Sequence, residues 1–347
     1  MTGPAVDWPA DGLEPVPACP LCGGIDRVTL LRDLRDGLYG APGRWELHRC
    51  VTCTCAYLDP RPTQATLPLA YASYLYLTHQ PPLEQTVPVA RIARFRRTVR
   101  NGYLNRKWGY GLAPATRLGP VILAPAPVHR RVARLAVRDL PYVRPEPTLL
   151  DLGCGNGTFL VQAETAGWRA EGIDPDPASV AEARGRGLTA HLGTLDDHPL
   201  IPESFDAVTL SHVIEHLVDP VATLAECRRL LRPGGLLWIA TPNLASPGYR
   251  QYGRDWLGVD APRHLVLFTP ESLRRTFEQA GFDLELLPPS RARWMFEGSE
   301  AIRQRRTGQG NPRGWRLRAL EFAVHDLRAL RNRGAGEELI ALGRPIG

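Results

Sequence analysis

The stretch LLDLGCGNGTFL, from Leu149 to Leu160, places three glycines at alternate positions directly behind an apolar run. The run predicts a buried strand, and glycine allows both a positive φ and close approach of a ligand to the backbone. The spacing is one residue shorter than the G-x-G-x-x-G of dinucleotide-binding folds, and no Gly-Lys-Ser/Thr follows, so a Walker loop is excluded. The turn predicts a ligand site at the carboxyl end of a strand.

Asp174 ends the next predicted strand, seventeen residues after Gly157. A carboxylate at this position can accept hydrogen bonds from both hydroxyls of a ribose, and it disfavours a ribose with a 2′-phosphate. The alternative is that the glycines only make a tight strand-to-helix turn. The paired carboxylate favours a nucleoside site over that structural role.

Short apolar runs alternate with helical patterns from residue 147 to about residue 290. The runs TLLDLG, RAEGID, FDAVTLS and GLLWIATPN read as buried strands, and amphipathic segments such as VATLAECRRLLRPGG separate them. This alternation is typical of β-α-β units. The sequence therefore predicts an α/β fold with a parallel sheet and helices on both faces.

Four segments, LLDLGCGNG, GIDPDP, SFDAVTLSHVIEHLVDP and RRLLRPGGLLWIATPN, resemble in order and spacing the motifs of the class I S-adenosylmethionine-dependent methyltransferases. The resemblance implies a Rossmann-like sheet of seven strands whose last strand, in EELIALGRP, is antiparallel. It implies S-adenosylmethionine as cofactor, with the glycines at the methionine part, Asp174 at the ribose, and Thr194 and Leu195 beside the adenine. The cofactor-binding residues expected by position are Asp151, Gly153, Gly155, Gly157, Asp174, Pro175, Thr194, Leu195 and Ser211.

The segment SHVIEH provides His212, Glu215 and His216, and His264 follows later in APRHLVLF. Transfer of a methyl group to a hydroxyl needs a base, and an imidazole with a near-neutral pKa is suited to that role. These four residues are the expected catalytic set. Two alternatives stay open: His212, Glu215 and His216 could hold a divalent ion, or the side chains could only cap a helix and pack the loop.

The cysteines favour a metal site over a disulfide scaffold. CPLC and CVTC form two C-x-x-C pairs, and four thiolates close a tetrahedral site, so we expect Cys19, Cys22, Cys50 and Cys53 to hold structural zinc. Cys55 reads as a spare thiol, with His48 as another possible ligand. The two remaining cysteines, Cys154 and Cys227, read as small buried residues.

Composition divides the chain into three predicted units. Residues 1–60 form a small zinc-ribbon-like unit, residues 61–146 a basic helical lid or substrate-side cap, and residues 147–347 the methyltransferase domain, with a helical insertion at about 291–333. The segment after the second cysteine pair resembles the zinc-ribbon segment attached to some methyltransferases, including sugar C-methyltransferases. That resemblance implies a cap containing Tyr71, Tyr74, Tyr76 and His79, although the tyrosines could equally be core residues.

In RIARFRRTVRNGYL, Ile92, Phe95, Val99 and Tyr103 recur at helical spacing and predict an apolar face opposite an Arg-rich one. From Gln85 to Arg138 there are twelve Lys or Arg and no acidic residue, within a chain of net charge +6. Solvated helix faces explain such a run, and so does an anionic substrate. Nucleic acid is less favoured, and a weak peripheral membrane contact through this helix is a further option.

No signal peptide and no apolar run long enough to span a membrane occur, so we expect a cytoplasmic protein. The predicted function is transfer of a methyl group from S-adenosylmethionine to a small or carrier-bound metabolite, with oxygen favoured as acceptor atom. The alternatives are a sugar C-methyltransferase, a zinc-ribbon RNA methyltransferase and a non-catalytic cofactor-binding protein. The sequence leaves the acceptor and the oligomeric state undetermined.

Overall fold

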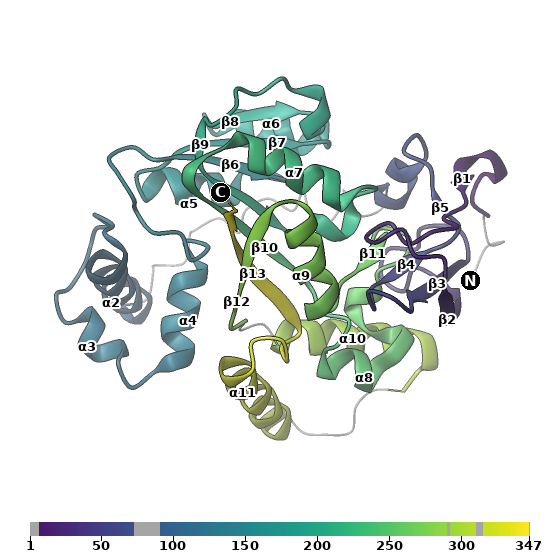
Figure 1. Ribbon diagram of the computed structural model, residues 1–347. Coiled ribbons are helices and arrows are strands. Elements are labelled where there is room, and N and C mark those ends of the chain that lie inside the picture. Colours follow the sequence, from purple (N-terminus) through teal and green to yellow (C-terminus); the bar gives the residue numbers. More distant parts are fainter. Residues whose placement is uncertain (1–6, 73–90, 290–291, 310–314, 347) are drawn as a thin grey trace.

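The computed structural model describes residues 7–72, 91–289, 292–309 and 315–346 (Figure 1). A seven-stranded sheet lies at the centre, a small unit with β1 to β5 lies on one side, and α2 to α4 lie on the other. Among the residues described, no helix has both the length and the hydrophobicity that a membrane crossing requires. Tyr74, Tyr76 and His79, which the sequence assigned to a cap, lie outside the described residues.

The central sheet has the strand order β12-β13-β10-β9-β6-β7-β8. All neighbouring pairs are parallel except those made by β13, which is antiparallel to both β10 and β12. The predicted seven-stranded α/β fold with an antiparallel final strand is therefore confirmed. The strands are β6 (Thr148–Leu152), β7 (Arg169–Asp174), β8 (Thr189–Leu192), β9 (Phe205–Ser211), β10 (Leu231–Pro242), β12 (Phe282–Leu287) and β13 (Glu338–Pro345).

Helices cover both faces of this sheet because successive strand residues supply two separate cores. On β10, Leu236 and Trp238 pack with α5 and α6, whereas Leu237 and Ile239 pack with α7 and α9. The helices of the core and its C-terminal part are α5 (Thr158–Thr165), α6 (Pro177–Gly185), α7 (Pro220–Leu230), α8 (Pro247–Tyr252), α9 (Pro270–Gln279), α10 (Ala292–Thr307) and α11 (Trp315–Arg331).

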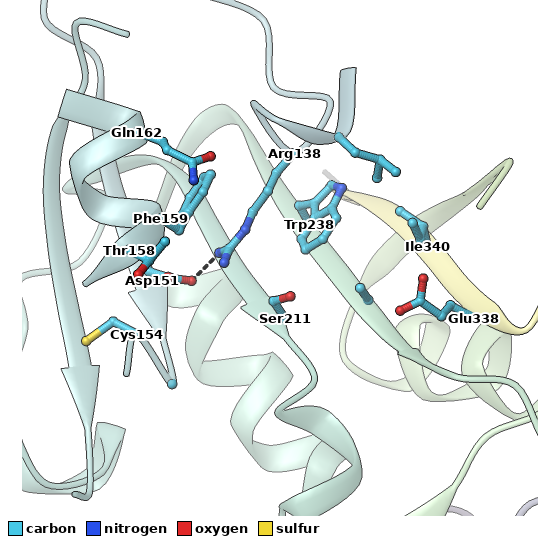
Figure 2. A pocket seen from close by; sticks show the side chains of 13 residues that line it. Arg138, Asp151, Cys154, Thr158, Phe159, Gln162, Ser211, Trp238, Glu338 and Ile340 are labelled. Atoms are coloured by element: carbon cyan, nitrogen blue, oxygen red, sulfur yellow. Dashed lines mark hydrogen bonds and ion pairs between the residues drawn. The ribbon is translucent and has the colours of Figure 1, made fainter. Parts of the chain in front are cut away.

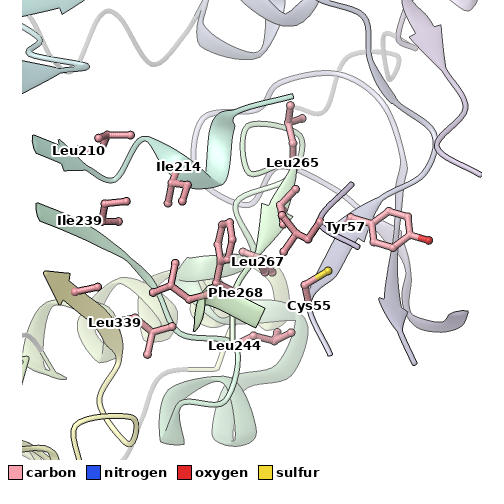
Figure 3. Packing of buried hydrophobic residues seen from close by; sticks show 14 of the residues in the cluster. Cys55, Tyr57, Leu210, Ile214, Ile239, Leu244, Leu265, Leu267, Phe268 and Leu339 are labelled. Carbon is pink, nitrogen blue, oxygen red and sulfur yellow. The ribbon is translucent and has the colours of Figure 1, made fainter. Parts of the chain in front are cut away.

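The N-terminal part contains a two-stranded ribbon, β1 with β5, and a four-stranded sheet of order β11-β4-β3-β2. Its fourth strand, β11, comes from far along the chain, and β11 pairs antiparallel with β4. Figure 3 shows the apolar cluster that continues from Leu210 and Ile239 of the central sheet to Tyr57 of β4. The strands are β1 (Leu13–Glu14), β2 (Arg27–Leu34), β3 (Trp45–Cys50), β4 (Ala56–Leu58), β5 (Arg61–Pro62) and β11 (Val266–Leu267).

A buried ion network joins these two sheets. Arg263, which has no exposed surface, donates to both carboxylate oxygens of Asp260 at 2.5 and 3.0 Å and to Asp36 at 2.7 Å. It also donates to the carbonyl oxygen of Ala70 at 2.8 Å. Asp36 and Ala70 belong to the N-terminal part, whereas Arg263 lies just before β11. One guanidinium therefore fixes the position of the chain between β10 and β11 against the N-terminal part.

The helices α2 (Arg91–Trp108), α3 (Gly119–Leu123) and α4 (Pro127–Leu135) pack together beside the sheet. The predicted apolar face of α2 is only half correct. Val99 and Tyr103 are buried, but Ile92 and Phe95 are 65% and 59% exposed. The reason is that α3 packs on the second half of α2, where Gly119 at the start of α3 approaches the backbone of Val99 and Tyr103, and no described residue covers the first half.

Replacing Arg263 with alanine should lower the free energy of unfolding by about 3–5 kcal/mol, because it leaves the carboxylates of Asp36 and Asp260 buried without their cation. Urea denaturation of the full chain measures the loss. Arg44→Ala is the matched control, since Arg44 makes an exposed pair with Asp33 and its removal should cost at most about 1 kcal/mol. Equal losses in the two variants would contradict the structural role of Arg263.

Candidate functional site

The glycine turn connects β6 to α5 at the carboxyl edge of the sheet. Gly153 has a φ of +68°, and a Cβ there would lie 2.4 Å from a methyl carbon of Val213. Gly155 has a φ of +52°, and a Cβ there would meet no atom within 4 Å. Gly153 thus lets the loop after β9 approach the turn closely, whereas Gly155 leaves one side of the turn open to a ligand.

Asp174, at the end of β7, faces this turn. Its Oδ2 accepts a hydrogen bond from the backbone N–H of Gly155 at 2.8 Å, and its Oδ1 accepts one from Asp176 N–H at 2.9 Å. Burial raises the pKa of Asp174, and the two backbone bonds counteract that effect. The carboxylate is therefore held in one orientation beside the open side of the turn.

The residues expected beside the adenine lie next to the end of β7. The backbone N–H of Gly193 donates to the carbonyl oxygen of Asp174, so the following segment starts at the same edge. Thr194 begins a short 3₁₀ turn, and its N–H and hydroxyl both donate to Asp197, at 2.6 and 2.9 Å. Leu195 is buried, and Pro175 follows directly after Asp174.

A cavity of about 320 Å³ opens at the carboxyl end of β6 (Figure 2). Three of the predicted cofactor residues, Asp151, Gly153 and Ser211, line it. Gly155, Gly157, Asp174, Pro175, Thr194 and Leu195 are not part of the cavity wall but lie along the same edge of the sheet. The remaining lining residues are Leu135, Arg138, Cys154, Thr158, Phe159, Gln162, Trp238, Ala240, Glu338 and Ile340.

Arg138 is the main residue of this cavity that the sequence reasoning missed. Figure 2 shows its side chain reaching between Phe159 and Trp238 toward Asp151. The guanidinium donates to Asp151 and, at 2.6 Å, to Thr209, and its Cζ lies 3.5 Å from the ring centroid of Phe159. Arg138 has a φ of +48°, a strained conformation that turns the chain after α4 so that the side chain enters the cavity. In the sequence this residue only ends a basic run.

Asp151 and Trp238 leave two polar atoms of the cavity available. Oδ1 of Asp151 accepts from Arg138 and Thr209, but its Oδ2 makes no hydrogen bond within the described residues. The indole Nε1 of Trp238 also lacks a partner there. Both atoms are buried, and an unpaired buried carboxylate oxygen favours a ligand that donates hydrogen bonds. The cavity thus combines a cation, an available acceptor and aromatic walls.

The four residues of the expected catalytic set lie close together: His212, Glu215 and His216 follow β9, and His264, just before β11, lies against His216 and Glu215. His212 is placed between two carboxylates, with Nδ1 3.3 Å from Glu215 Oε1 and Nε2 2.8 Å from Glu338 Oε1. Burial would lower the pKa of His212, but Glu215 and Glu338 raise it to about 9. Burial opposes the charge of Glu215, yet His212 and the other two histidines lower its pKa to about 2. His212 is therefore a cation near neutral pH rather than a base.

His216 and His264 face each other in a different way. Their ring centroids are 4.7 Å apart, and His264 Nε2 lies 4.0 Å from Glu215 Oε1. Burial, and then repulsion from His264, lowers the pKa of His216 to about 4. Glu215, His216 and His264, rather than the set that includes His212, bring donor atoms within 4.8 Å of one another. The spacing in SHVIEH alone did not predict this grouping.

Four cysteine sulfurs meet at the edge of the N-terminal sheet. The Sγ atoms of Cys19, Cys22, Cys50 and Cys53 lie within 4.8 Å of one another. Cys19 and Cys53 are 3.5 Å apart, and Cys22 and Cys50 are 3.6 Å apart. Four bonds of about 2.3 Å to one zinc ion place sulfurs about 3.8 Å apart, so the arrangement fits a tetrahedral ion.

Cys55 and His48 stand outside that set of four. The Cys55 sulfur lies 3.4 Å from Cys19 and 3.5 Å from Cys53, but Cys55 is not a member of the group of four whose sulfurs all lie within 4.8 Å of one another. His48 contacts Thr29 and Glu46 instead of the cysteines. Both residues therefore neighbour the cysteine cluster without completing it.

Comparison with known proteins gives one family and several relatives. The family model described as a methyltransferase domain matches residues 125–287. A malonyl-[acyl-carrier protein] O-methyltransferase from Serratia marcescens is 35% identical over 134 residues, which are 38% of this chain and 52% of that protein. A ubiquinone biosynthesis O-methyltransferase from Cereibacter sphaeroides is 31% identical over 147 residues, which are 39% of this chain and 60% of that protein.

The chain thus spans about half to three fifths of the length of these two relatives. Among solved structures, a methyltransferase from Archaeoglobus fulgidus is 19% identical, with a TM-score of 0.42 over 69% of this chain and 97% of that one. The family match agrees with the strand order of the central sheet and with the motifs along its carboxyl edge. Residues 125–287 of the chain therefore match a methyltransferase domain.

Proposed function

We propose that the chain transfers a methyl group from S-adenosylmethionine to an oxygen atom of a small or carrier-bound metabolite. The observation that carries the proposal is the placement of the catalytic cluster: Ser211 lines the cavity, and His212 follows it directly. A ligand in the cavity and an acceptor at the cluster would therefore meet. The names of the two relatives support oxygen as acceptor atom and a carrier-bound or quinone-like acceptor.

The residues present fit this cofactor. Asp174 is oriented to accept hydrogen bonds from ribose hydroxyls, and Gly155 leaves the backbone open beside it. At the cavity, Asp151 Oδ2 suits an ammonium group, and the Arg138 guanidinium suits a carboxylate. An α-amino acid carries both groups. We infer that Asp151 and Arg138 hold the methionine end of the cofactor, whereas Thr194 and Leu195 border the adenine.

When bound, S-adenosylmethionine supplies an electrophilic methyl carbon whose bond to sulfur breaks with both electrons going to sulfur. The acceptor oxygen forms the new bond and loses its proton. Enzymes accelerate such a displacement mainly by alignment and by exclusion of water. The imidazoles of His216 and His264 are the groups placed to act on the acceptor hydroxyl, because His212 already carries a proton between its two carboxylates.

Cysteine chemistry does not support a competing mechanism. Burial, followed by the charges of Asp151 and Asp174, raises the pKa of Cys154 to about 12, so this thiol stays protonated. Burial also raises the pKa of Cys227. Neither thiol is therefore suited to attack a nucleic-acid base, which disfavours an RNA methyltransferase that uses a cysteine nucleophile. The sugar C-methyltransferase, a zinc-ribbon RNA methyltransferase of another chemistry and a non-catalytic protein that only binds the cofactor remain as alternatives.

Titration calorimetry with S-adenosylhomocysteine should show one site per chain, and Asp174→Asn should weaken binding at least tenfold. A hydrogen bond to a charged group contributes about 1.5–3 kcal/mol, and about 1.4 kcal/mol is a factor of ten. Asp283→Asn is the control, because Asp283 is an exposed residue of β12. Absence of binding to the wild-type chain would refute the cofactor assignment.

Turnover should depend on the histidine cluster. Incubation of S-adenosylmethionine and a small-molecule extract with the wild-type chain should produce S-adenosylhomocysteine over time, together with a product heavier by one methylene. We expect His216→Ala to slow this by about 10²–10⁴-fold, the usual contribution of a proton-transfer group. His191→Ala, on the edge strand β8, is the matched control. A His216→Ala variant with full turnover would remove this residue from the mechanism.

We propose further that Cys19, Cys22, Cys50 and Cys53 hold one structural zinc ion, in the first of the three units predicted at residues 1–60, 61–146 and 147–347. The ion would close a site of four thiolates and tie the loop before β2 to the loop after β3. In this structural role the zinc would take no part in methyl transfer.

Metal analysis of purified Cys19→Ser/Cys22→Ser should show one equivalent of zinc less than the wild-type chain. The melting temperature should fall too, because binding of such an ion contributes directly to folding. Cys227→Ser serves as control, since Cys227 is buried in α7 far along the chain. Unchanged zinc in the double variant would contradict the assignment.

A further inference from the structure

Glu215, His216 and His264 form a group whose donor atoms converge. Each offers one ligand atom, and these atoms lie within 4.8 Å of one another. Glu215 has no exposed surface and His264 is 8% exposed. Bonds of about 2.1 Å to a shared ion require neighbouring ligand atoms about 3–3.5 Å apart. Small side-chain rotations therefore bring the three residues onto one ion.

Hydrogen bonds fix the proton on each ring at the nitrogen that points away from such an ion. His264 Nδ1 lies 2.8 Å from the carbonyl oxygen of Gly258, and His216 Nδ1 lies 2.9 Å from both the carbonyl oxygen of Arg263 and the hydroxyl oxygen of Tyr71. A carbonyl oxygen can only accept and a hydroxyl can do either, so a hydrogen on each Nδ1 satisfies all of these contacts; in that tautomer of the neutral ring Nε2 carries the lone pair. Metal-binding histidines characteristically donate their other N–H to a carbonyl or a carboxylate in this way.

A hydrogen bond also orients the carboxylate of Glu215. The Thr241 hydroxyl donates to Glu215 Oε2 at 3.0 Å, whereas Oε1 lies 3.3 Å from His212 Nδ1. Oε1 is the oxygen that lies 4.0 Å from His264 Nε2. The backbone also ties the two ligand segments together, since Leu265 N–H donates to the Glu215 carbonyl oxygen at 2.8 Å. Thr241 thus holds Oε2, and Oε1 faces both His212 and His264.

We propose that Glu215, His216 and His264 bind one divalent transition-metal ion next to the cavity. Two imidazoles and one carboxylate suit ions such as Zn²⁺, Fe²⁺ or Co²⁺ better than Mg²⁺ or Ca²⁺, and three protein ligands leave positions for water or substrate. His212 is not a ligand, because its two nitrogens face Glu215 and Glu338. This set corrects the alternative that the sequence suggested, His212 with Glu215 and His216.

The role of the ion rests on the proposed function. An acceptor hydroxyl on the open position would lose its proton to solvent more readily, since a bound cation stabilises the oxyanion. The oxygen would then form its bond to the methyl carbon as the bond from that carbon to sulfur breaks. In this arrangement His216 and His264 act on the acceptor through the metal, and replacement of either still slows turnover.

The test uses the full chain with its cysteine site filled by zinc, titrated with Co²⁺ alone. One further equivalent should bind, with visible absorption and without the thiolate-to-cobalt charge-transfer bands that binding to cysteine produces. Glu215→Gln and His264→Gln should each weaken binding more than tenfold, and His191→Gln should not. Each variant is first checked for an unchanged melting temperature and unchanged affinity for S-adenosylhomocysteine.

A second measurement needs no variant. Proton spectra of the wild-type chain with cobalt should contain two strongly shifted signals that disappear in D₂O, one from each Nδ1–H. No uptake at millimolar Co²⁺, cobalt bound only by thiolates, or binding unchanged in both ligand variants would overturn the metal site. If the chain still binds S-adenosylhomocysteine, the proposed function stands without it; if it does not, that function fails independently.

Discussion

The buried guanidinium of Arg263 is the contact on which the arrangement of the whole molecule depends. A charge without exposed surface must be fully paired, and here Asp260 pairs it locally while Asp36 and Ala70 pair it across the chain. The same residue gives its carbonyl oxygen to His216, and the next residue is His264. Beyond these, β11 completes the N-terminal sheet. The segment around Arg263 therefore both joins the two sheets and orients the imidazoles of His216 and His264.

The cofactor side of the site has a different origin, because it is built almost entirely by local structure. The turn after β6, the carboxylate at the end of β7 and the loop after β8 lie at neighbouring carboxyl ends of parallel strands, where α/β sheets bind ligands. Arg138 reaches this edge from the helical part on the other side of the sheet. The cavity thus lies between the glycine turn after β6 and the Arg138 guanidinium. The histidine cluster proposed to face the acceptor lies toward the N-terminal part.

The division between local and distant contacts explains what the sequence could predict. The glycine spacing, Asp174 and the apolar runs carry their own structural consequences, so the α/β sheet and its antiparallel last strand could be derived from them. Nothing in the sequence links Val266 to β4, turns Arg138 into the cavity or aligns His264 with Glu215. The exposed Ile92 and Phe95 show the same limit, since helical period identifies a face and not the partner that covers it.

A crystal structure of the full chain with S-adenosylhomocysteine tests the central claim most directly. We expect the ribose hydroxyls on Asp174, the amino-acid end between Asp151 and Arg138, and the sulfur directed toward Ser211 and the histidine cluster. That position would align a methyl group with an acceptor at the cluster. An empty cavity with these side chains unmoved, or the compound bound elsewhere on the chain, would contradict the account.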